Sequence, residues 1–433
     1  MMLVLATVFL LAVLLILILK SNFLPGNIMA LLPIAVALVI GTGFSNTLGF
    51  VHEGISDVLV IAALLIFATI YFGVMSDAGL FEPIINRLLR SRLIGKSVFS
   101  VVAVTALIAV VTHLDGQGIT TLMVTVPPML IVFDKLKISR TLMALIFCTV
   151  VTTMNILPWA GPAARAATVL GLEDVMILYR KLAPVQVISL ISSFVILYFA
   201  SRAEQKRGLF IPAGDVQLVG QIAVSEETKA LQRPKLFWIN LIITVILIAS
   251  LFIGVPSYIG FLIGCAIVLP LNYRTAKEQN ARIKSYAGNL LVNVYTVVGA
   301  GALLGIMDGT GMFDALANAI VSVIPSQLNS VIHIIVGLLV TPLSWLLNAD
   351  AMIYGVMPVM VNIGAQYNVS PDTVASMFVV GRCLGGGLCL TTASTYLGLG
   401  LMGLNYRDAF KVIFKWSLLL GTTMVILTAI IVK

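Results

Sequence analysis

Long apolar stretches recur along the whole chain, and short polar loops separate them. A helix needs about 20 mostly apolar residues to cross a bilayer. In the first half this pattern predicts full membrane-spanning helices over Leu3 to Leu19, Pro25 to Gly41, Asp57 to Met75, Thr141 to Leu170 and Leu182 to Ala200. The fold class that follows is an all-α polytopic membrane protein.

The pattern changes between the third and fourth of these spans. Leu80 to Gly95 has apolar residues at helical spacing beside arginines, which is typical of an amphipathic helix in the membrane interface. Two shorter apolar stretches follow, Val98 to Thr112 and Leu122 to Phe133, with a glycine-rich turn between them. Each is short for a crossing, so we predict a re-entrant hairpin over about residues 97–133, entering and leaving on the same side.

The second half of the chain repeats the first. Phe72 to Phe81 matches Leu304 to Phe313, and Ser139 matches Ser370, with the matched positions 231 or 232 residues apart. We expect both serines to cap the start of a helix. A register kept over such a distance indicates internal duplication.

The duplication suggests how the chain is divided. Asp77 and Asp308 also match between the halves, and we interpret both as helix-end caps. We predict a first repeat over residues 1–201 with a broken helix at about 141–170, a cytoplasmic linker over 202–235, and a second repeat over 236–433 with a hairpin at about 330–365 and a broken helix at about 372–403.

Each predicted repeat holds five transmembrane helices plus one re-entrant hairpin, and an odd number of crossings inverts the second copy. The loop charges test this orientation. Lysines and arginines crowd the loops that the arrangement places inside, whereas the outside segments hold only Arg180, Lys181 and Lys433. This bias predicts a multi-pass protein of the cell inner (plasma) membrane with both termini outside.

The composition agrees with that class and excludes others. The chain has 433 residues, of which 60% are hydrophobic and 10% charged, and no soluble fold of this length tolerates such a balance. The net charge is +8, but the basic residues lie in short loops rather than in one patch, so we expect no nucleic-acid partner. The sequence shows no paired catalytic carboxylates, nucleophile elbow or zinc-ligand spacing, so we predict that it is not an enzyme.

The hairpin tips are the first places with candidate chemistry. In the first repeat Asp115-Gly116-Gln117-Gly118 forms the turn, and Thr120 and Thr121 open the returning half-helix. A helix N-terminus at mid-membrane presents free N–H groups and the positive end of its dipole to an anion. In the second repeat we expect the tip near Asn348 and Asp350.

The broken helices supply the other candidates, and each contains an arginine, Arg165 in the first and Arg382 in the second. An unpaired arginine at membrane depth costs several kcal/mol, so each should have a partner. The other candidate binding residues of the two breaks are Asn155, Pro158, Gly161, Thr391, Thr392, Ser394 and Thr395.

Two interpretations stay open for the charged groups. Arg165 and Arg382 either hold carboxylates of an organic anion bidentately or form internal ion pairs with Asp115 or Asp350. The two aspartates either coordinate a coupling cation or carry a proton, or they cap the hairpin turns. His113 either takes part in a proton relay or is simply hydrogen-bonded.

At these residues the chain resembles the citrate-metal:proton symporter family (CitMHS) of the ion transporter superfamily. The strings that carry the resemblance are Asp115-Gly116-Gln117-Gly118-Ile119-Thr120-Thr121, the segment from Met154 to Ala167, the segment from Asp350 to Pro358, and Ser394-Thr395-Tyr396-Leu397. The resemblance implies an inverted-repeat elevator-type transporter, a homodimer, whose scaffold domain stays still while a transport domain of hairpins and broken helices carries substrate. It also implies uptake of citrate complexed with a divalent metal and driven by protons.

One position departs from the family. The family usually shows Asp-Gly-Asp-Gly where this chain has Gln117 as the third residue. Glutamine can ligate a metal through its carbonyl oxygen but brings no charge, so a divalent-metal or proton site is weakened there.

We therefore predict a secondary active transporter that lies in the lipid bilayer and imports citrate or a related di- or tricarboxylate. Coupling to protons is expected, with co-transported Mg, Ca or Zn as an option and no permanently bound cofactor. The alternative is a sodium-coupled carrier or an anion exchanger for another small organic acid. In this hypothesis Asp115 and Asp350 handle the coupling ion or metal, and the other candidates bind the substrate.

Overall fold

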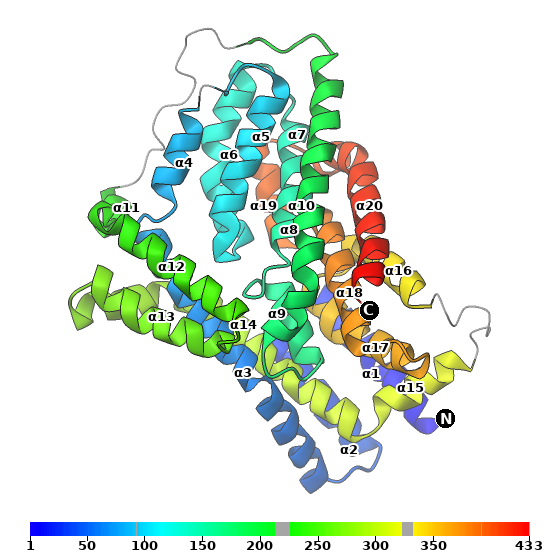
Figure 1. Cartoon of the computed structure of the whole chain (residues 1–433). Coiled ribbons are helices and arrows are strands. Elements are labelled where there is room, and N and C mark those ends of the chain that lie inside the picture. Colours follow the sequence, from blue (N-terminus) through cyan, green and yellow to red (C-terminus); the bar gives the residue numbers. More distant parts are fainter. Residues whose placement is uncertain (92, 213–225, 323–331, 391, 433) are drawn as a thin grey trace.

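The computed structural model describes residues 1–91, 93–212, 226–322, 332–390 and 392–432, and this part of the chain is helical (Figure 1). The first half contains α1 (Met2–Lys20), α2 (Pro25–Val39), α3 (Phe44–Asp77), α4 (Glu82–Leu89), α5 (Val98–Thr112), η1 (His113–Asp115), α6 (Gly118–Lys135), α7 (Arg140–Ile146), η2 (Phe147–Val151), α8 (Thr152–Met154), α9 (Gly161–Val169) and α10 (Val175–Gln205).

The second half of the chain begins with a short connecting helix. Its elements are α11 (Glu226–Leu231), η3 (Pro234–Leu236), α12 (Phe237–Phe252), α13 (Ser257–Asn272), α14 (Ala276–Gly309), α15 (Met312–Val321), α16 (Ile332–Leu346), η5 (Ala351–Val356), α17 (Met357–Gln366), α18 (Pro371–Gly385), η6 (Gly386–Leu388), α19 (Ala393–Met402) and α20 (Tyr406–Ile431).

Among the described residues, eight helices are long and apolar enough to cross a membrane. They are Met2–Lys20, Phe44–Asp77, Val98–Asp115, Gly118–Lys135, Val175–Gln205, Pro234–Phe252, Leu290–Gly309 and Tyr406–Ile431. The prediction of a polytopic helical membrane protein is therefore confirmed. Both arms of the first hairpin are among the eight, so by length each could cross alone, and the re-entrant path stays a prediction.

Local sequence signals set the helix ends as expected. The side chain of Ser139 accepts from the N–H of Thr141 at the start of α7, and that of Ser370 accepts from Thr373 at the start of α18. α3 extends well beyond the predicted Asp57 to Met75 stretch, because its first turns are polar and an apolar-run criterion cannot detect them. The interfacial helix is shorter than predicted and spans Glu82–Leu89.

The helices pack in two groups. In the first, α14 lies against α2 and α3, α13 lies against α3 and α12, and α1 lies against α2 and α15. α3 and α14 approach so closely that a Cβ on Gly54 would overlap the backbone of Gly301, an arrangement that small residues permit in membranes. The second group contains α5 to α10 and α16 to α20, with α18 packed between α16 and α20 (Figure 1).

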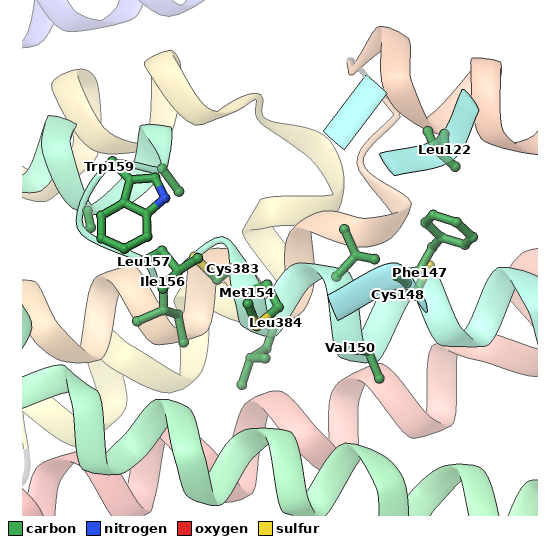
Figure 2. Close-up of a cluster of buried hydrophobic side chains, with 14 of the residues drawn as sticks. Leu122, Phe147, Cys148, Val150, Met154, Ile156, Leu157, Trp159, Cys383 and Leu384 are labelled. Carbon is green, nitrogen blue, oxygen red and sulfur yellow. The ribbon is translucent and has the colours of Figure 1, made fainter. Parts of the chain in front are cut away.

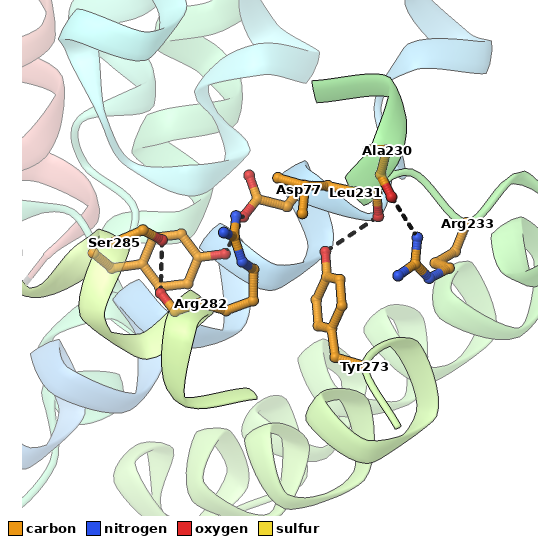
Figure 3. Close-up of polar contacts among 8 residues, drawn as sticks. Asp77, Ala230, Leu231, Arg233, Tyr273, Arg282 and Ser285 are labelled. Atoms are coloured by element: carbon orange, nitrogen blue, oxygen red, sulfur yellow. Dashed lines mark hydrogen bonds and ion pairs between the residues drawn. The ribbon is translucent and has the colours of Figure 1, made fainter. Parts of the chain in front are cut away.

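The end of the predicted linker is docked on the first group (Figure 3). The N–H of Arg233 donates to the carbonyl of Ala78 at 2.9 Å, and the hydroxyl of Tyr273 donates to the carbonyl of Leu231 at 3.3 Å. Asp77 is not a helix cap as interpreted from the sequence. Its carboxylate pairs with Arg282 of α14 at 3.2 Å and accepts from the hydroxyl of Tyr286, so it joins two long helices.

Candidate functional site

A buried histidine holds the first hairpin tip to the first break, which is the loop between α8 and α9. Nδ1 of His113 lies 2.7 Å from Oγ1 of Thr121, and Nε2 lies 3.0 Å from Oδ1 of Asn155. The hydroxyl of Thr121 also bonds to the carbonyl of Gln117 at 2.9 Å. The turn, the start of α6 and the end of α8 are thus connected through one imidazole ring.

The same tip is closed by backbone contacts. The Asp115 carboxylate accepts from the N–H of Gln117 at 2.7 Å, and Gly116 has a φ of +73°, which favours glycine. The indole N–H of Trp159 in the break donates to the carbonyl of Leu114 at 2.8 Å. Asp115 therefore does cap the turn, and its side chain is 9% exposed.

The second tip and break are linked by one backbone bond and one thiol among the contacts that the structure describes. The N–H of Leu390 donates to the carbonyl of Trp345 at 2.7 Å, and Sγ of Cys389 lies 3.3 Å from the carbonyl of Leu347. At this tip the side chain of Asn348 accepts from the N–H of Ala351 at 2.9 Å. Asn348 therefore caps the returning arm.

The two breaks touch each other. The thiol of Cys148 in η2 donates to the carbonyl of Gly387 in η6 at 3.3 Å, and a Cβ on Gly387 would lie 2.7 Å from the Cα of Cys148. Figure 2 shows Met154 and Ile156 of the first break beside Leu384 at the end of α18. Residues more than 200 positions apart in the sequence thus form one centre.

A cavity of about 100 Å³ opens at this centre, between α6, the first break and α19. Its polar lining comes from both halves of the chain. Of the predicted binding residues, it contains Gly118, Asn155, Ser394 and Thr395. Sequence reasoning missed Cys148, Thr152, Gly386 and Gly387 as lining residues, and the π-helical turn that contains Cys148 has no sequence signal that we recognise.

Other predicted residues face a second cavity of about 360 Å³. Asp115, Gln117 and Thr120 line it from the hairpin tip, and Asp77 and Tyr286 line it from α3 and α14. The hairpin therefore separates two environments, with the start of α6 facing the centre and the tip acid facing the first helix group.

Among the described residues, one of the two arginines is paired with an acid, and the other is not. Nε of Arg165 lies 2.8 Å from Oδ1 of Asp350, so this arginine forms the internal ion pair. Arg382 is 7% exposed, and no residue that the structure describes gives it a hydrogen bond or an ion pair. A Cβ on Gly386 would overlap Nη1 of Arg382, which places this guanidinium directly over a residue of the central cavity.

The remaining candidates have structural positions. A Cβ on Gly161 would overlap Nη1 of Arg165, so this glycine makes room for the paired arginine. Pro158 is buried in the break loop. The hydroxyl of Thr392 is buried without a partner among the described residues, and Thr391 lies outside them.

Comparison with known proteins shows the family of this chain. The profile of the CitMHS family, described as "Citrate transporter", matches residues 2–284. A "Citrate transporter" of Bacillus subtilis (strain 168) is 31% identical over 404 residues, which cover 93% of this chain and 92% of the relative. A "Mg(2+)/citrate complex secondary transporter" of the same organism is 32% identical over 407 residues, covering 93% and 91%.

A solved structure shows the same fold at low sequence identity. The Alcanivorax borkumensis YdaH transporter aligns with a TM-score of 0.60 and 14% identity, over 99% of this chain and 98% of that one. At this identity the likeness concerns the fold alone. The relatives are transporters and not enzymes. From the profile match and the two Bacillus relatives, this chain belongs to the CitMHS citrate transporter family.

Proposed function

We propose that this protein is a secondary active transporter that imports citrate or a related di- or tricarboxylate, and that the substrate binds beside Arg382 in the cavity between the two breaks. The observation that carries the proposal is the buried guanidinium of Arg382, which lacks an acidic partner within the described part of the chain. A buried cation is costly unless an anion compensates it. A substrate carboxylate would supply that anion.

The chemistry around the cavity suits such a ligand. A guanidinium can donate two parallel hydrogen bonds to one carboxylate. Asn155 lines the cavity from the first break and brings a polar side-chain amide to it. Ser394 and Thr395 add hydroxyl donors from the other half of the chain. A small anion with several carboxyl and hydroxyl groups matches this set of donors.

The relatives narrow the substrate class. Two of them are named as transporters of citrate and of its magnesium complex. Within the described residues, no group of three or more histidine, cysteine or acidic side chains is arranged to hold a metal ion. We therefore propose that any Mg, Ca or Zn crosses as part of the substrate, bound mainly by citrate.

The two packing groups support a mechanism as well. We propose that α1 to α3 and α12 to α15 form a fixed scaffold, and that the hairpins and breaks move against it as an elevator. Inverted repeats, a homodimer in the inner membrane and termini outside complete this proposal. Proton coupling is proposed rather than sodium coupling, with Asp115 and Asp350 as the acids at the two tips.

The test is uptake of labelled citrate into proteoliposomes under an inward proton gradient, with and without Mg²⁺, Ca²⁺ or Zn²⁺. We expect accumulation that an uncoupler abolishes. Uptake that needs a metal would assign the metal complex as substrate, and uptake without metal would assign free citrate. Uptake that follows a sodium gradient, or occurs only in exchange for internal anion, would replace the proton-coupled proposal. No carboxylate uptake under any gradient would refute it.

A further inference from the structure

An ion pair and an arginine that is unpaired among the described residues come from three elements of the structure. Arg165 comes from α9, Asp350 precedes η5, and Arg382 comes from α18. α9 packs against both η5 and α18. The three charged residues therefore lie on elements that pack around α9, and we refer to them as the charged cluster.

Within this cluster Arg165 and Asp350 form an ion pair with few other contacts at its facing atoms among the described residues. The side chains of Arg165 and Asp350 are 15% and 18% exposed, and the facing atoms lie 2.8 Å apart. Neither Nε of Arg165 nor Oδ1 of Asp350 has a further hydrogen-bond partner among the residues described. A buried pair of this kind depends on both charges, and loss of the charge on Asp350 would leave Arg165 without a counter-ion.

We propose that Asp350 competes with the substrate for Arg165, and that protonation of Asp350 releases Arg165 to bind a second substrate carboxylate beside the one held by Arg382. This inference rests on the proposed function and adds the coupling step to it. The proton comes from the water on the loading side and binds the Asp350 carboxylate. It is released when the substrate leaves and the ion pair re-forms.

The charge balance supports this step. With Asp350 ionised, the two arginines and one aspartate carry a net charge of +1, enough for one carboxylate. With Asp350 protonated the cluster carries +2, which matches two carboxylates of a citrate-like anion. Binding of the anion and of the proton then favour each other, as linkage requires.

The surroundings of Asp350 contain few other titratable groups. Arg165 and Arg382 face it from α9 and α18, and Tyr354 lies one helical turn further along its own segment. α1 also packs against η5, but it does so with apolar side chains such as Leu15, which lies next to Gly355. Asp350 is the acidic member of this cluster.

The decisive experiment compares wild type with Asp350→Asn in two assays on the same proteoliposomes. In citrate/citrate exchange, which needs no net proton movement, we expect the variant to keep at least a third of the wild-type rate. In uptake driven by a proton gradient, we expect it to lose accumulation by tenfold or more. Asp350→Glu should restore accumulation in part, because it keeps a group that can be protonated.

A binding measurement provides the second readout. Between pH 7 and 8 the wild-type Kd for citrate should rise by up to about tenfold per pH unit, as for one linked proton. The Asp350→Asn variant should bind more tightly and lose that component, and the titration of citrate itself cancels in the comparison. Asp372→Asn is the matched control, because Asp372 pairs with Lys181 at 2.6 Å instead of with either arginine.

The outcomes separate the two proposals. Absence of carboxylate transport by wild type would refute the proposed function. Wild-type transport together with proton-driven accumulation by Asp350→Asn would refute the competition alone. If the variant is unstable in detergent, citrate should raise its Tm more than it raises that of wild type, and an equal or smaller rise would contradict the release of Arg165.

Discussion

The two breaks are held to their hairpin tips by different contacts. The first is tied to its hairpin tip by side chains, with His113 bridging Thr121 and Asn155 and with the indole of Trp159 on a tip carbonyl. At the second, the N–H of Leu390 donates to the carbonyl of Trp345, and the thiol of Cys389 donates to the carbonyl of Leu347. The hydrogen bonds that hold a tip to its break therefore differ between the two places.

The arginines differ in the same way. Arg165 is neutralised by Asp350, whereas Arg382 has no acidic partner in the described residues. Within the described part of the chain, one arginine is thus balanced by an acid from the other half of the chain, and the second arginine is not. In our proposal the unpaired guanidinium holds the substrate, and release of the paired one couples binding to protonation.

The largest expected effect is at the unpaired arginine. Arg382→Lys keeps the charge but loses the planar pair of donors, so citrate uptake should fall by about 100-fold or more. Uptake into proteoliposomes measures this, with Arg407→Lys at the exposed start of α20 as the control. Near-normal uptake by Arg382→Lys would show that this arginine does not hold the substrate.

The second-largest effect is expected in the hydrogen-bond network of His113, Thr121 and Asn155. His113→Ala removes the partner of both Thr121 and Asn155 and leaves a buried space, so it should destabilise the protein by about 2 to 3 kcal/mol. Thermal unfolding in detergent, with and without citrate, checks this. An unchanged Tm would mean that the network does not hold the first break in place.

A smaller effect is expected at the glycine beneath Arg382. Gly386→Ala introduces a Cβ where Nη1 of Arg382 lies, so the guanidinium must shift and the KM for citrate should rise about tenfold. Gly400→Ala in α19 is a matched control, because a Cβ there meets no atom within 4 Å. If both variants behave alike, the position of Arg382 over the cavity is not important for binding.

The smallest expected effect is a difference in stability between Trp159→Phe and Trp345→Phe. Trp159→Phe loses the hydrogen bond to the carbonyl of Leu114 and should cost about 1 kcal/mol of stability. Trp345→Phe should cost less, because Nε1 of Trp345 is buried without a partner among the described residues. The difference in Tm between the two variants measures the side-chain contribution to the first break, and equal losses would remove this contrast between the halves.

Much of this architecture could be predicted from the sequence, because it depends on local signals. Apolar length predicts the membrane helices, and serine before an apolar run predicts caps such as those at Ser139 and Ser370. Proline and glycine within long spans predict the breaks at Pro158 and Gly386. These features act over a few residues, so a single sequence contains them.

Tertiary structure decided what those breaks do. The sequence offered Asp115 and Asp350 as equal partners for the arginines, and the fold joined Arg165 to Asp350 while it left Arg382 without a partner in the described part of the chain. It also brought Cys148 against Gly387 and so created the central cavity. Pairing of charges and close approach of backbones depend on distances across the molecule, which no local pattern of residues specifies.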